Sequence, residues 1–277
     1  VLFRSWDEDL CDLFDIPANI LPEPVPSAGD FGTITTIPAL DGVPVTGIAG
    51  DQQAALYGQT CFRPGQAKNT YGTGAFVVMN TGDKPVIDSS LATTRAIDAA
   101  GNPCYALEGS IFVAGAAVQW LRDELGIIEH ASETSAIASS IPDNGGVYFV
   151  PALTGLGAPY WNMEARGTIT GITRGSNRNH IVRAALESMA YQTCDVIDAM
   201  HCAGVTELQQ LMVDGGVVAN DFLMQFQADM LGVDVARPET VESTALGAAM
   251  LAGREEGLWV TAESLQSLHR IERVFHP

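Results

Sequence analysis

Short apolar segments alternate with longer segments of helical period along most of this chain. Five short segments are bounded by Gly, Pro or Asn, which is typical of buried strands. The longest helical pattern covers residues 179–202, where apolar side chains recur every three or four positions. Strands and helices in alternation predict an α/β fold. The predicted strands are residues 75–79, 104–107, 147–150, 167–172 and 210–213.

Glycine and proline mark where the predicted helices end and where no helix is expected. Three further helical segments, 114–125, 220–231 and 244–256, are each followed directly by Gly. Glycine at that position can adopt the left-handed conformation that closes many helices. Residues 21–44 contain five prolines and several glycines, so this segment is predicted to be connecting structure.

Composition and charge narrow the classes of protein. With 47% apolar and 17% charged residues, the 277-residue chain can bury the core of one large domain or two small ones. A net charge of −19 disfavours nucleic acid as a partner. No apolar run is long enough for a membrane helix and no signal pattern begins the chain, so we expect a cytoplasmic protein without a membrane span. The five cysteines form no C-x-x-C pair and are interpreted as reduced thiols.

Three glycine-rich turns, residues 71–74, 155–159 and 214–216, are candidate phosphate-binding loops. Glycine lets backbone N–H groups approach a phosphate closely, but any single turn of this kind is more often an ordinary tight turn. Neither the P-loop nor the G-x-G-x-x-G dinucleotide fingerprint occurs. The histidines show no metal-ligand spacing, and no G-x-S-x-G motif supports a hydrolase.

Asp51 is the one acidic residue whose position indicates chemistry. It follows an apolar run at 43–48, predicted as a strand, and precedes a helical segment at 53–57. Ligands of open α/β sheets bind at the carboxyl ends of strands, where this carboxylate would emerge. Alternatively, Asp51 caps the following helix, since Asp is a favoured N-cap residue. The two interpretations are equally supported by position, and both could hold together.

A series of motifs in order along the chain resembles the FGGY carbohydrate kinases, and among them the members that act on glycerol. The series begins with GIAGDQQAALYGQ (47–59) and AKNTYGTG (67–74), and it continues almost to the end of the chain. The later motifs are YALEG (105–109), QWLRDE (119–124), PALTGLGAPYW (151–161), GTITGI (167–172) with HIVRAALE (180–187), and VDGGVVAN (213–220).

The resemblance implies an actin-like, ribonuclease H-like sugar-kinase fold with ATP in a cleft between two domains. Residues 1–60 would be the C-terminal remnant of the N-terminal domain, and residues 61–277 would be the C-terminal nucleotide-binding domain. Residues 1–5 fit nothing that follows and are interpreted as non-native sequence. The opening phosphate hairpin of such kinases is missing, so we expect a fragment that is inactive alone.

The resemblance also implies site residues on a glycerol side and a nucleotide side. Asp51 matches the general base that orients and deprotonates the hydroxyl, while Gln52 and Phe76 match substrate contacts. ATP and Mg²⁺ are the implied cofactors, and no residue is assigned as a metal ligand. Five residues match nucleotide contacts: Thr73, Gly115, Gln119, Gly216 and Asn220.

The implied reaction is phosphorylation of glycerol by ATP to sn-glycerol 3-phosphate in the complete enzyme. One alternative is another FGGY kinase acting on a pentulose or a gluconate-like acid, and a second is a non-catalytic, actin-like nucleotide-binding module. The G-D-Q-Q run and the aromatic Phe76 favour glycerol, because an aromatic side chain narrows the pocket. Expected partners are glycerol and ATP or ADP, with a homo-oligomer as the expected assembly of the full enzyme.

Overall fold

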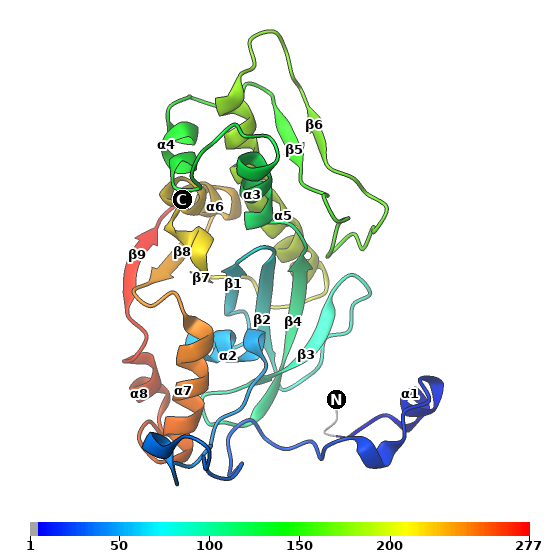
Figure 1. The fold of residues 1–277 in the computed structure, drawn as a ribbon, viewed down its shortest axis with the longest axis vertical. Coiled ribbons are helices and arrows are strands. Elements are labelled where there is room, and N and C mark those ends of the chain that lie inside the picture. The colour runs from blue at the N-terminus through cyan, green and yellow to red at the C-terminus, as the bar shows by residue number, and fades with distance from the viewer. Residues whose placement is uncertain (1–4) are drawn as a thin grey trace.

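A seven-stranded mixed sheet forms the centre of the molecule (Figure 1). The computed structural model describes residues 5–277, so most of the segment 1–5 interpreted as non-native lies outside the described residues. The strand order is β3-β4-β2-β1-β7-β8-β9, in which β1, β7 and β8 are parallel and the other neighbours are antiparallel. The strands are β1 (Ala67–Tyr71), β2 (Ala75–Gly82), β3 (Ala92–Ile97), β4 (Pro103–Ile111), β7 (Gln210–Asp214), β8 (Asp234–Pro238) and β9 (Ile271–Phe275).

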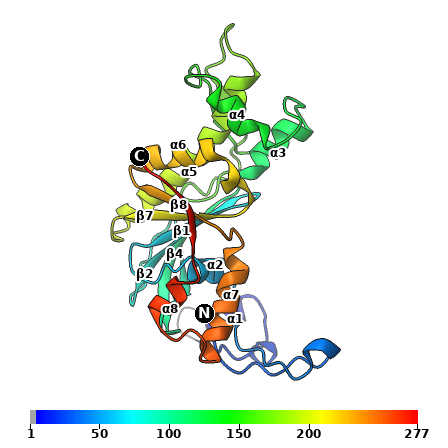
Figure 2. The ribbon, with the colours of Figure 1, turned by 90° about the vertical axis from the view of Figure 1, so that its left-hand side faces the viewer.

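Helices cover both faces of this sheet (Figure 2). Helices α5 (Arg178–Cys202) and α6 (Asp221–Leu231) lie on one face, whereas α2 (Asp51–Gly58) and α7 (Ser243–Glu255) lie on the other. The remaining elements pack around this arrangement or extend from it, as Figure 1 shows. They are α1 (Glu8–Leu13), α3 (Gly115–Asp123), α4 (Glu133–Ser139), α8 (Ala262–Gln266) and a second, two-stranded sheet of β5 (Tyr148–Val150) and β6 (Thr168–Thr170).

Strand β1 directs different side chains to the two faces. Asn69 and Tyr71 point to the α5 face, where Asn69 Nδ2 donates to Thr193 Oγ1 (3.1 Å) and Tyr71 Oη donates to Gln227 Oε1 (2.7 Å). Lys68 bonds to helix α2 on the opposite face, as the alternation of side chains along a strand requires. The central strand therefore carries buried polar groups on both sides.

The predicted regular elements are largely confirmed. Five of the six predicted strands occur, as do the five predicted helical segments, with bounds that differ by a few residues. Gly126, Gly232 and Gly257 follow their helices with φ of 62°, 66° and 77°, the left-handed conformation expected of them. The proline-rich segment 21–44 holds only one short 3-10 turn, η2 (Pro38–Leu40).

The strand predicted at residues 43–48 is wrong. This segment forms only isolated bridges, Thr33 with Pro44 and Ala28 with Gly47, because it folds back on the proline-rich segment instead of joining the sheet. Four strands were also not predicted, namely β1, β3, β8 and β9. Strands β1 and β3 contain runs of polar residues, Lys68-Asn69-Thr70 and Thr93-Thr94-Arg95, which hide the apolar signal of a strand.

Glycines bring α2 and α7 to backbone distance. A Cβ atom added to Gly247 would lie 1.8 Å from the carbonyl oxygen of Ala54, and one added to Gly58 would lie 2.2 Å from that of Ser243. No side chain fits between backbones at these distances, so the two helices pack as one unit. This contact fixes the position of α2, and with it the position of Asp51.

We expect Gly247→Ala to destabilise the protein by about 1–3 kcal/mol, because the added methyl group overpacks a backbone contact. Urea unfolding of the two proteins measures the difference. The matched control is Gly175→Ala, whose added Cβ would lie 3.8 Å from its nearest neighbour and should change stability by less than about 0.5 kcal/mol. Equal stability of Gly247→Ala and the unmodified chain would contradict the close packing.

Candidate functional site

A pocket of about 530 Å³ lies beyond the carboxyl ends of β1 and β7. Its walls are the turn between β1 and β2, helix α3, the segment that precedes and begins α4, and the 3-10 turn η3 (Gly216–Ala219). The structure brings all five residues predicted on the nucleotide side into this lining, although they span almost 150 residues of the chain. They are Thr73, Gly115, Gln119, Gly216 and Asn220.

Close backbone approaches shape this pocket. A Cβ on Gly115 would lie 2.6 Å from the carbonyl oxygen of Gly72, and one on Gly215 would lie 2.3 Å from that of Tyr71. Gly215 also has a φ of +89°, a conformation that favours glycine. Gly216 differs, since nothing lies within 4 Å of an added Cβ. Its backbone therefore borders open space, as a group that contacts a ligand must.

The third glycine-rich turn, residues 155–159, does not line this pocket. A Cβ on Gly157 would lie 2.1 Å from the carbonyl oxygen of Ser110, so this glycine allows the loop to pack against the end of β4. The interpretation of this turn as a candidate phosphate-binding loop is therefore not supported at this pocket. Its glycine is required by packing, as the ordinary-turn interpretation allows.

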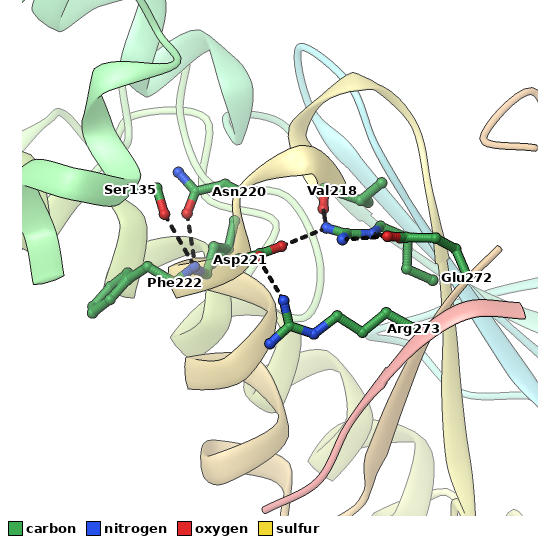
Figure 3. Close-up of polar contacts among 9 residues, drawn as sticks. Ser135, Val218, Asn220, Asp221, Phe222, Glu272 and Arg273 are labelled. Atoms are coloured by element: carbon green, nitrogen blue, oxygen red, sulfur yellow. Dashed lines mark hydrogen bonds and ion pairs between the residues drawn. The ribbon is translucent and has the colours of Figure 1, made fainter. Parts of the chain in front are cut away.

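Asn220 holds two helices together at the edge of the pocket. Its Oδ1 accepts from the backbone N–H of Leu223 (3.0 Å), which makes it the N-cap of α6, and its Nδ2 donates to Thr134 Oγ1 (3.0 Å) in α4. Figure 3 shows this side chain beside Ser135, whose hydroxyl accepts from the Phe222 N–H (3.3 Å). Both ends of the amide are used within the protein, so Asn220 shapes the pocket wall.

A charged cluster behind η3 was not predicted from the sequence (Figure 3). Arg237 on β8 donates to the Val218 carbonyl oxygen (2.7 Å), to Asp221 (2.8 Å) and to Glu272 (2.5 Å). Arg273 donates to the second oxygen of Asp221 (2.6 Å). The hydrogen bond from Arg237 lowers the pKa of Glu272 below its usual value. Only the Val218 bond reaches η3 directly, and it ties this turn of the pocket to the sheet.

Asp51 lies outside the pocket lining, at the start of α2. It is neither at a strand end nor the N-cap, because residues 43–48 form no strand and Gly50 occupies the cap position. Its exposed carboxylate accepts only from the N–H of Gln52 (2.8 Å) among the described hydrogen bonds. Both interpretations made from its position are therefore corrected, since Asp51 is the first residue of the helix.

One short segment joins Asp51 to the pocket. The hydroxyl of Thr244 donates to the backbone carbonyl oxygen of Asp51 (3.4 Å), and the carbonyl oxygen of Val241, three residues earlier, accepts from the N–H of Gly215 (3.3 Å). Gly215 precedes Gly216 in the pocket wall. The start of α2 and the glycine turn after β7 are thus held against the same four residues.

Gln52 and Phe76 share a partner that sequence reasoning missed. The ammonium of Lys68 donates to Gln52 Oε1 and to the Phe76 carbonyl oxygen (3.1 Å). Neither Gln52 nor Phe76 lines the nucleotide pocket, and both are partly buried. The available signal for Lys68 was its rarity, because the chain contains only two lysines.

Residues 5–277 contain neither a candidate membrane span nor a candidate metal-binding cluster. No helix there is both long and apolar enough to cross a membrane. No group of three or more His, Cys, Asp or Glu side chains is arranged there to hold a metal ion.

Comparisons with known proteins agree on one family. The sequence model of the C-terminal domain of the FGGY family of carbohydrate kinases matches residues 67–256. A glycerol kinase from Carboxydothermus hydrogenoformans is 58% identical over 99% of this chain and 55% of its own length, and one from Shewanella frigidimarina is 56% identical over 98% and 54%. The chain therefore spans about 55% of the length of these curated relatives.

Solved structures give the same picture of the fold. The crystal structure of Plasmodium falciparum glycerol kinase with ADP superposes with a TM-score of 0.90 at 41% identity, covering 98% of this chain and 55% of that one. A ligand-bound xylulose kinase from Lactobacillus acidophilus has a TM-score of 0.87 over 99% of this chain and 56% of its own, at 23% identity. The fold is the actin-like α/β fold of these sugar kinases, as expected.

We expect Arg237→Met to destabilise the chain by about 1–3 kcal/mol, because it leaves the buried Val218 carbonyl group without its donor. Urea unfolding again provides the measurement. Arg273→Met is the matched control, since Arg273 contacts the same Asp221 from a half-exposed position and should contribute less than about 1 kcal/mol. An equal effect of both substitutions would mean that only the surface charges matter.

Proposed function

The chain belongs to the FGGY family of carbohydrate kinases, and on that premise we propose that it is part of a kinase that transfers the γ-phosphoryl group of ATP to glycerol, forming sn-glycerol 3-phosphate. The proposal rests mainly on residues 241–244, which bond both to the glycine turn in the pocket wall and to the start of α2. On one side lies a pocket lined by all five expected nucleotide residues, and on the other lies Asp51 at the start of α2.

ATP or ADP is the proposed occupant of the pocket. Backbone groups at the glycine turns after β1 and β7 are accessible there, and glycine turns of this kind let N–H donors approach phosphate oxygens. Thr73 would donate to the phosphates, Gly115 and Gln119 would contact the nucleotide from α3, and Gly216 with Asn220 would border the adenosine. The Plasmodium falciparum structure, which contains ADP, supports this assignment.

Glycerol is proposed to bind between Asp51, Gln52 and Phe76. The hydroxyl of an alcohol has a pKa near that of water, about 15.7. Complete transfer of its proton to an ordinary aspartate before the reaction would cost about 16 kcal/mol, from the difference of about 12 pKa units. In a loose phosphoryl-transfer transition state the nucleophile need not be an alkoxide. Asp51 therefore orients the hydroxyl and accepts its proton late.

Mg²⁺ is expected to arrive with the nucleotide. This ion usually keeps several waters and binds through phosphates and one or two carboxylates, rather than through an all-protein cage. Since residues 5–277 provide no cluster of three suitable side chains, we assign no metal ligand in this chain and derive no step through the ion.

The domain boundary is also proposed. Residues 1–60 would belong to the N-terminal domain and residues 61–277 to the nucleotide-binding domain, an assignment supported by the match of the C-terminal domain from residue 67. Asp51 would then stand on the N-terminal side of the boundary while its helix packs against α7 on the other side.

We expect glycerol to be the preferred substrate of a completed kinase. By completed kinase we mean this chain joined to the part of the Carboxydothermus hydrogenoformans glycerol kinase that it does not match. In a coupled ADP-release assay, kcat/KM should be at least about 10-fold higher for glycerol than for xylulose or gluconate. The loss of a single hydrogen bond to a poorly fitting substrate already lowers kcat/KM by about this factor. The isolated chain should show no turnover. A preference for xylulose, or turnover by the isolated chain, would contradict the proposal.

Asp51→Asn in the completed kinase should lower kcat by about 10²- to 10⁴-fold, the usual contribution of a general base. The dissociation constant of ATP, measured by calorimetry, should stay unchanged because Asp51 lies outside the nucleotide pocket. The control is Asp41→Asn, which removes an exposed carboxylate in the proline-rich segment 21–44 and should leave kcat and the dissociation constant of ATP unchanged. An undiminished kcat in Asp51→Asn would assign the base to another residue.

A further inference from the structure

Lys68 is a fully buried cation beside the proposed glycerol site. We propose that Lys68 is a positioning residue that fixes Gln52 and the Phe76 backbone for binding glycerol, an inference that rests on the proposed function. Lys68 itself does not line the nucleotide pocket, and its bonds run to the glycerol side.

All three donors of the Lys68 ammonium have acceptors, and each acceptor comes from a different element. They are Oε1 of Gln52 on α2, Oγ1 of Thr70 on β1 (2.8 Å) and the carbonyl oxygen of Phe76 on β2 (3.1 Å). An ammonium has three N–H groups and no lone pair, so this set is complete. The helix that begins at Asp51 is thereby bonded through one atom to both strands of the central hairpin.

The ammonium also dictates which way the Gln52 amide points. Because Lys68 can only donate, Gln52 must present its oxygen to Nζ, and the opposite orientation would place an NH₂ group against a cation. The NH₂ group of Gln52 is then left to donate to another acceptor. A glycerol hydroxyl oxygen beside Asp51 is such an acceptor, while its hydrogen is directed at the carboxylate.

Acidic groups from three elements face the ammonium. They are Asp214 at the end of β7, Glu108 on β4 and Asp51 on α2, and the Cys61 thiol also lies nearby. Asp214 is 1% exposed, and neither of its carboxylate oxygens has a hydrogen-bond partner among the described residues. Burial lowers the pKa of Lys68 to about 8, an effect that Asp214 and then Glu108 oppose. Lys68 is thus mostly protonated at neutral pH.

This arrangement is poorly explained by stability alone. Burial of a charged pair is often no better for stability than apolar side chains of the same volume. A methionine would fill a similar space here without requiring three acceptors and nearby carboxylates. What an apolar residue cannot do is orient the amide of Gln52 or bind the Phe76 carbonyl group.

The test compares Lys68→Met with Lys84→Met in the completed kinase. Lys84 is the other lysine of the chain and is exposed, so the control removes the same charge away from the site. Lys68→Met should raise KM for glycerol by about 10-fold or more, the value of one charge-assisted hydrogen bond, and leave KM for ATP within about twofold. Lys84→Met should change neither. An unchanged KM for glycerol, or equal rises in both KM values, would overturn the inference.

A pH profile separates positioning from a purely structural role. As the pH rises through about 8, Lys68 loses a proton and one of its three donors, so KM for glycerol in the unmodified kinase should rise. Lys68→Met should lack this dependence between pH 7 and 9.5, whereas Lys84→Met should keep it. The same profile in all three proteins would overturn the inference.

Thr70→Val keeps the inference testable if Lys68→Met does not fold. It removes one acceptor of the ammonium without changing charge or shape, and it should raise KM for glycerol by about 2- to 10-fold with KM for ATP unchanged. An unchanged KM for glycerol in this variant would count against positioning. If the unmodified completed kinase fails to phosphorylate glycerol, the proposed function itself is wrong. If it does phosphorylate glycerol and the variants have the same KM for glycerol as the unmodified kinase, only the role of Lys68 is rejected.

Discussion

Backbone-to-backbone contact at glycine is the constraint on which the site depends. The turn after β1 meets the start of α3 at Gly115 and meets the turn after β7 at Gly215, in both cases at distances that exclude a Cβ atom. The same kind of contact, at Gly58 and Gly247, joins α2 to α7. Because protein interiors are close-packed and resist compression, these contacts leave little freedom in where the pocket walls and α2 lie.

The central strand β1 places buried polar side chains on both faces of the sheet. Side chains of β1 on the α5 face bond to Thr193 and Gln227 and complete the larger core, from which α3 and α4 extend to form the pocket wall. Side chains on the opposite face, led by Lys68, bond to the helix that begins at Asp51. A single strand of five residues therefore connects the nucleotide side to the glycerol side.

Much of this organisation could be predicted from the sequence, because the relevant signals are local. Helix α5 has a long apolar period, and the glycines after α6 and α7 close them as expected. The five pocket residues were predicted from the resemblance to the FGGY kinases, which rests on several motifs in order and on no single turn. The strand at 43–48 was predicted wrongly because an apolar run does not say whether a sheet edge is available to it.

The unpredicted parts of the site depend on tertiary contacts. Arg237 and Lys68 each bind acceptors from several different elements, and no helical or strand periodicity encodes those partners. Strand β1 was missed for the same reason, since Lys68 bonds to helix α2 on one face and Asn69 to helix α5 on the other. The third glycine loop looked equivalent to the others until the contact of Gly157 with Ser110 separated it from the pocket.

The mixed pairing of β1 has a consequence for the order in which the molecule forms. On one edge β1 pairs with β2 through a tight hairpin, β2 pairs with β4, and β4 pairs with β3, all antiparallel and all within residues 67–111. On its other edge β1 pairs in parallel with β7, so that Ala67 lies beside Leu211, which is far along the chain. Loop-closure entropy makes distant parallel pairing slow relative to local hairpins. We therefore expect the pocket, which needs the ends of both β1 and β7, to form later in folding than the β1–β2 hairpin that holds the Lys68 bonds to Thr70 and Phe76.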